Sequence, residues 1–209
     1  MSDISGTFDQ AAKALPKALP RARTAARYRA RANAETAWRR WATQHRVAAA
    51  ALGGLVAVQV ASLLGFWLRG FGLSELDFNT ANGAVYLPQA THVQQFLVGG
   101  LSHYIDGAVF ALIFAVAVSP LLPLPATRMG NLAKAMIFST ILGLLAIFVV
   151  LPYVFGPVYG VHDDALLAFH NGWKYALSVL LVHWVYGANL GLFYNPLDDD
   201  PLDSEQPAG

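Results

Sequence analysis

The sequence predicts an all-α integral membrane protein, a four-helix bundle with a basic interfacial helix at its N-terminus. Of the 209 residues, 56% are hydrophobic and 13% are charged, whereas soluble domains are about 25% charged. Four mostly apolar runs have the roughly 20 residues that cross a hydrocarbon core, at about 47–68, 95–119, 132–153 and 166–192. We expect a basic cytoplasmic arm at 1–46, a membrane domain at 47–194 and an acidic cytoplasmic tail at 195–209.

The positions of Lys and Arg near the ends of the apolar runs predict an orientation. Arg39, Arg40 and Arg46 precede the first run, and Arg128 and Lys134 lie at the start of the third. Connections rich in Lys and Arg stay in the cytoplasm. We therefore expect a multi-pass protein of the cell (inner) membrane with both termini in the cytoplasm.

The arm itself has the composition of a helix that lies on a membrane surface. Ten of the 14 Lys and Arg residues of the chain lie in its first 46 positions. A helical projection places Trp38 and Trp41 on one stripe and Arg39 and Arg40 away from it, as in helices bound to anionic lipid. Direct continuity with a membrane span favours lipid or a partner subunit, so we expect no nucleic acid as a partner. An organellar transit peptide is the alternative, and acidic residues near the start favour a retained arm.

Small residues recur at every fourth position or its multiples and predict close contacts between helices. In lipid, such rows mark the faces on which helices pack. They leave open whether the neighbouring helix belongs to this chain or to another. The positions are Gly53, Ala57, Ala61 and Gly65 in the first run, Gly99 and Gly107 in the second, and Gly187 and Gly191 in the fourth.

Four titratable residues predict a polar layer inside the membrane, where ionisable groups are costly and are functional candidates. At 1.5 Å per residue, Asp106 and Lys174 lie about 16 Å and 14 Å into their runs, and we expect them to pair. His103 and His170 lie one turn away on the same faces. The layer is either a structural ion pair or a site for a proton path, a quinone, a haem or a metal. For iron, copper or zinc, His103, Asp106 and His170 would supply two histidines and one carboxylate.

Several other chemistries are excluded by the sequence. The chain has no cysteine, which removes disulfides, thiolate metal sites and iron–sulfur clusters. No Walker loop, dinucleotide fingerprint, HExxH or GxSxG pattern occurs.

The apolar connection at 70–94 is long for a helical bundle, and we expect it to cover part of the bundle or to dock a neighbour.

Two segments resemble a group of small uncharacterised four-helix prokaryotic membrane proteins. They are LSHYIDGAVFALIF in the second run and FHNGWKYALSVLLVHWVYGANLGLFYNP around the fourth. The group has an H-x3-G span followed by an H-x3-G-x3-G-x2-Y span, matched here by His103 with Gly107 and by His183 with Gly187, Gly191 and Tyr194. The resemblance covers residues 95–196 and implies association with respiratory enzymes such as haem–copper oxidases.

The expected function is that of an accessory, non-catalytic subunit of a larger, energy-transducing membrane complex. Its expected partners are other membrane subunits and anionic lipid. The alternative is a redox or proton-handling membrane protein, in which the intramembrane layer binds haem, quinone or metal.

Overall fold

The structure is a computed structural model that describes residues 36–125, 127–158 and 171–196 of the chain. The chain divides into two compact units, Met1–Arg39 and Arg40–Gly209. Throughout the described part, the chain forms helices and connections without any β-strand. Most of the basic N-terminal helix that we expected lies outside the described residues. Its described part, residues 36–44, is helical.

Four segments are long and apolar enough to cross a membrane, which confirms the predicted all-α architecture with four candidate spans. They are Arg46–Phe71, His92–Leu121, Arg128–Val158 and Trp173–Phe193, with 26, 30, 31 and 21 residues. The second and third are longer than the roughly 20 residues that a hydrocarbon core requires. Tilt or extension beyond the core accommodates such lengths.

The spans are built from the following elements. The first is α3 (Arg46–Trp67) and the 3-10 helix η1 (Leu68–Phe71); the second is α5 (His92–Ile113), the π-helical η2 (Phe114–Val118) and α6 (Ser119–Leu121). The third is α7 (Arg128–Leu145), the π-helical η3 (Ala146–Phe155) and α8 (Gly156–Val158), and the fourth is α10 (Trp173–Phe193). The short helix α4 (Phe78–Tyr86) lies between the first two spans.

The fourth span begins later than the sequence predicts. The expected run started at residue 166, but Asn171 and Gly172 form a turn and α10 starts at Trp173. Gly172 has φ = +91°, a conformation that side chains other than glycine rarely adopt. The start of the helix is therefore set by a backbone turn that mean hydropathy does not reveal.

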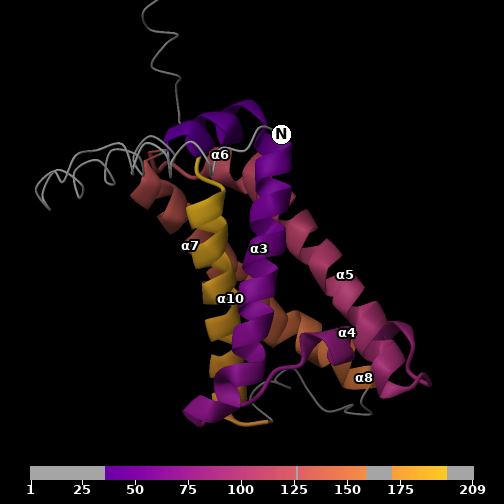
Figure 1. Ribbon diagram of the computed structural model, residues 1–209. Helices are drawn as coiled ribbons and strands as arrows, with labels where there is room; N and C mark the ends of the chain where they lie inside the picture. Colours follow the sequence, from indigo (N-terminus) through magenta and orange to yellow (C-terminus); the bar gives the residue numbers. More distant parts are fainter. Residues whose placement is uncertain (1–35, 126, 159–170, 197–209) are drawn as a thin grey trace, which may run out of the picture. The chain divides into compact units, whose positions relative to one another are not determined.

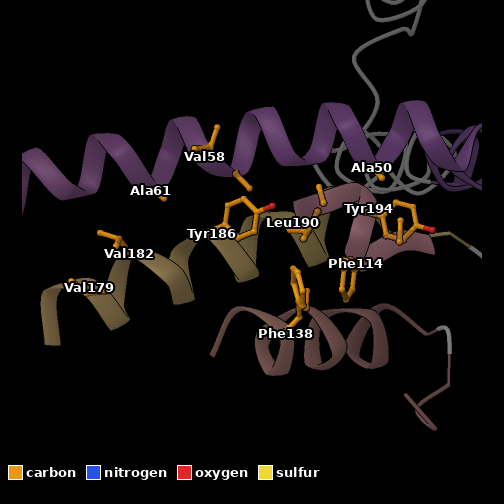
Figure 2. Packing of buried hydrophobic residues seen from close by; sticks show 14 of the residues in the cluster. Ala50, Val58, Ala61, Phe114, Phe138, Val179, Val182, Tyr186, Leu190 and Tyr194 are labelled. Atoms are coloured by element: carbon orange, nitrogen blue, oxygen red, sulfur yellow. The ribbon is translucent and has the colours of Figure 1, made fainter. Parts of the chain in front are cut away.

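The spans pack side by side in the order α5, α3, α10 and α7 (Figure 1). Their shared core combines small residues of α3 with larger side chains of the other spans, and Figure 2 shows Ala50, Val58 and Ala61 on α3. At one end of the core, Phe114 packs against Phe138 and Tyr194, with ring centroids 5.4 Å and 6.0 Å apart.

The small residues of the predicted rows lie at contacts within this chain. A Cβ added to Gly107 would lie 2.7 Å from Cβ of Val58, and one added to Gly187 would clash with Oγ of Ser139. Ala57 and Ala61 are buried. Gly53 lies beside Phe193, Gly65 beside Leu76, Gly99 beside Asn79, and Gly191 beside Leu132. These rows therefore pack against other segments of the same chain. The sequence alone left open whether the neighbour belonged to this chain or to another.

The connection at 70–94 contains α4, which packs closely on α5. The Asp77 side chain caps α4 by accepting a hydrogen bond of 3.0 Å from the backbone N–H of Thr80. Gly83 of α4 meets the backbone of Gln95 at the start of α5, with no room for a side chain. The connection covers α5, as expected of so apolar a segment.

The third span changes its winding halfway along. Residues 146–155 form the π-helix η3, which contains Pro152. Proline has no N–H to continue an α-helical ladder, and π-turns are a common response to a local disruption. This change separates the second half of the third span from the regular geometry of α7.

Candidate ligand-binding cavity

A cavity of about 300 Å³ lies where α3, α4, α5, α7, η3 and α10 meet. Its lining is mostly apolar and includes a few polar side chains, which we call the polar side of the cavity. Polar side chains come from α4, α5 and α10, whereas α7 and η3 contribute apolar ones, among them Leu142, Val150, Leu151 and Phe155. Such a wall suits a molecule with an apolar body and a hydrogen-bonding group.

The cavity lies close to the outer surface of the bundle. Phe110 of α5 and Leu145 of α7 line the cavity, and they are 38% and 44% exposed. When the helices span a membrane, these exposed faces contact lipid.

His103 on α5 is held from two sides. Its Nε2 lies 3.1 Å from Oγ of Ser62 on α3. Its ring stacks on Phe78 of α4, with centroids 5.3 Å apart and planes inclined by 23°. Three elements therefore fix this imidazole at the cavity wall.

Asp106 follows His103 by one turn of α5 and also lines the cavity. The carboxylate is half-buried, and no side chain or backbone group among the described residues forms a hydrogen bond or ion pair with it. A charged or polar ligand group in the cavity would therefore meet a carboxylate that is free to bind it.

His183 and Tyr186 of α10 complete the polar side. His183 Nδ1 donates a hydrogen bond of 2.7 Å to the carbonyl oxygen of Val179. The hydroxyl of Tyr186 donates one of 2.7 Å to the carbonyl oxygen of Gly107. The predicted layer omitted both residues. His183 lies four residues before Gly187 and eight before Gly191, and this spacing was the signal that could have placed it on a packed helix face. Nothing in the sequence indicates that the Tyr186 hydroxyl bonds to Gly107.

Lys174 does not belong to this layer. It lies in the first turn of α10, is exposed, and donates a hydrogen bond of 2.9 Å from Nζ to the carbonyl oxygen of Gly72. The described residues contain no ion pair between Lys174 and Asp106. The expected depth and pairing are therefore wrong, because the helix starts at Trp173 and places Lys174 at its end. His170 lies outside the described residues.

The cavity does not gather a metal-ligand set from the described residues. Within that part of the chain, no group of three or more His, Cys, Asp or Glu side chains is close enough to hold a metal ion. The predicted set of His103, Asp106 and His170 includes one residue outside the described part. His103 and Asp106 do line the same cavity, together with His183.

The residues predicted for the interfacial arm do not line the cavity. Trp38 and Arg39 are half-buried, and Arg40 is exposed. Trp41 packs against the helical core and stacks on His45, with centroids 5.2 Å apart. Part of the predicted lipid-facing stripe is therefore used in packing within the chain.

Comparison of the chain with known proteins finds no match. No family model matches the chain, and no curated protein and no solved structure matches it.

Proposed function

We propose that this chain binds an amphipathic ring compound of quinone type, taken from the bilayer. The observation that carries the proposal is the mostly apolar cavity whose lining includes imidazole, carboxylate and phenol groups. Ligand sites are typically mostly apolar, with a few convergent polar groups that fix orientation. This function develops the redox or proton-handling alternative that the sequence left open.

The size and hydrogen bonding of the cavity favour a single ring system over a haem. About 300 Å³ lies at the lower end of the range of roughly 300–1,000 Å³ for small-molecule sites. Axial ligation through Nε2 of His103 would also require breaking its contact with Ser62. An organic headgroup needs only hydrogen bonds, which leave this contact intact.

Filling the cavity tests the proposal. Leu142 lines the cavity, whereas Leu144 on the same helix is 43% exposed and is absent from the cavity wall. We expect Leu142→Trp to abolish binding of a short-chain ubiquinone or menaquinone by the purified protein in nanodiscs. The matched variant Leu144→Trp should bind as the unmodified protein does. Equal binding by the two variants would remove the cavity as the site.

We also propose that the chain works as an accessory subunit beside other membrane proteins. Gln59 lies midway along the first span, is exposed, and accepts a hydrogen bond from the hydroxyl of Tyr104. Polar side chains at membrane depth normally face protein or water. The exposed amide of Gln59 would be covered by a neighbouring membrane helix, and this supports an accessory role. Quinone chemistry fits the respiratory setting that the resemblance implies.

Removal of this outward-facing amide tests the accessory role. We expect Gln59→Leu to lower the apparent mass of the assembly that the protein forms in mildly solubilised native membranes. Leu63→Val, another exposed position of α3, is the control and should leave the assembly unchanged. An assembly of unaltered mass in Gln59→Leu would count against a partner at this face.

We further propose the cell membrane as the location, with both termini in the cytoplasm and anionic lipid near the arm. Arg46 and Arg128 open the first and third spans, and exposed Arg40 precedes them. At the opposite ends, Arg69 lies 4.0 Å from Glu75 and Lys174 is bonded to Gly72. The positive-inside rule assigns the end with Arg40, Arg46 and Arg128 to the cytoplasm.

A further inference from the structure

The hydrogen bond of His183 fixes the tautomer of its ring. A carbonyl oxygen can only accept, so the contact with Val179 requires the proton to be on Nδ1. In the neutral ring, Nε2 then carries a lone pair and no proton. Since His183 lines the cavity, Nε2 is the ring atom left to bond a ligand, and it can only accept.

The hydroxyl of Tyr186 also already donates its proton in a hydrogen bond. Its hydroxyl proton is used by the carbonyl of Gly107, which cannot donate in return. The phenolic oxygen retains lone pairs, so Tyr186 also offers an acceptor at the cavity wall.

Asp106 adds two carboxylate oxygens that accept hydrogen bonds. Among the described residues, the cavity lining contains no Lys or Arg to balance this charge, and Lys174 is bonded to Gly72. Asn82 and His103 can each donate and accept a hydrogen bond, so they do not favour one form of the ligand over another. Among the described polar side chains of the lining, acceptors therefore outnumber donors.

From this hydrogen-bond inventory we infer that the cavity selects the reduced, hydroxyl-bearing form of its ligand, a hydroquinone, over the corresponding quinone. The inference rests on the proposed function and names the form of ligand that the site takes. A hydroquinone presents two O–H donors, whereas a quinone presents carbonyl oxygens that face other acceptors. Sites built to bond a hydroxyl discriminate strongly against analogues that lack it, because buried polar groups are left unpaired.

Anaerobic titration of the full chain in nanodiscs tests the selectivity. The probes are a short-chain hydroquinone and its quinone, with dithionite-free samples for the oxidised form. We expect the hydroquinone to bind at least about tenfold more tightly, the factor that one lost hydrogen bond typically produces. Equal binding, or tighter binding of the quinone, would overturn the inference while leaving the proposed function in place. Failure of both forms to bind would overturn the proposed function as well.

Two variants link the selectivity to the named groups. Asp106→Asn keeps the shape of the side chain and introduces an N–H donor, so quinone affinity should rise and the preference should fall. His183→Leu removes an acceptor and should weaken binding of the hydroquinone but not of the quinone. Lys174→Gln, away from the cavity, should keep the preference of the unmodified protein. A preference that stays the same in both Asp106→Asn and His183→Leu would contradict the assignment of acceptors.

Discussion

The hydroxyl of Tyr186 on α10 donates a hydrogen bond of 2.7 Å to the backbone carbonyl of Gly107 on α5. In the packing order of the spans, α3 stands between these two helices. The bond therefore joins two spans that are next-but-one neighbours, at the wall of the cavity.

Loss of this bond should loosen the bundle. We expect Tyr186→Phe to lower the free energy of unfolding by about 1 kcal/mol, typical of one hydrogen bond between helices in a membrane. Denaturation in mixed detergent micelles measures the change. Tyr153→Phe, at a position that is 67% exposed, is the control and should leave the midpoint in place. Equal shifts would show that the Gly107 contact contributes nothing.

Close packing at Gly107 gives a second prediction. A Cβ there would come within 2.7 Å of Cβ of Val58, so Gly107→Ala should destabilise the bundle by about 1–3 kcal/mol, the usual cost of overpacking. In a chain that carries Val58→Gly, which removes this Cβ, Gly107→Ala should cost much less than it does in the unmodified chain. At Gly100 the nearest neighbour is the Asn79 side chain at 3.4 Å, so Gly100→Ala should have a smaller effect. The same unfolding assay ranks the variants, and an equal cost of Gly107→Ala with and without Val58→Gly would argue against a steric cause.

Separation of Lys174 from Asp106 predicts independent effects of changing them. In a double-mutant cycle with Lys174→Gln and Asp106→Asn, the changes in unfolding free energy should add to within about 0.5 kcal/mol, as for distant sites. A larger coupling energy would restore the ion pair that the sequence suggests. The single variant Lys174→Gln should cost less than about 1 kcal/mol, because its hydrogen bond is exposed.

The proposed orientation predicts where reporter enzymes work. A reporter that is active only outside the cytoplasm should give no signal when fused to either terminus. The same reporter inserted after Gly72, in the first connection between spans, should give a strong signal. A signal from the C-terminal fusion would overturn the assigned topology or the number of spans that cross.

The four spans could be predicted because length and apolarity are properties of the sequence itself. The depth of Lys174 could not be obtained from them, since the turn at Asn171 and Gly172 interrupts an otherwise apolar stretch. Asn-Gly pairs do favour turns, so a signal was present, but mean hydropathy outweighed it. A depth counted from an incorrect helix start places a surface cation inside the membrane.

The candidate site was accessible to sequence reasoning only in part. His103 and Asp106 are noticeable because titratable groups are rare in apolar runs. Their position beside His183 depends on which helices are neighbours, and single helices do not encode that in their periodicity. Part of the cavity wall comes from the π-helical segment around Pro152, which regular helical projection does not represent.

The π-helix η3 has a consequence for how the cavity is encoded. A π-turn closes between residues i and i+5 instead of i and i+4, so residues 146–155 place one more residue in each hydrogen-bonded turn. A deletion within η3 can be absorbed when a π-turn closes as an α-turn. A deletion upstream, in the regular helix α7, would instead rotate all that follows by about 100°. Leu151 and Phe155 would then leave the wall they now form, although the span would remain equally apolar and nearly as long. The apolar wall is therefore specified by the count of residues more than by their identity: it tolerates exchange among Leu, Val and Phe but not a shift of register.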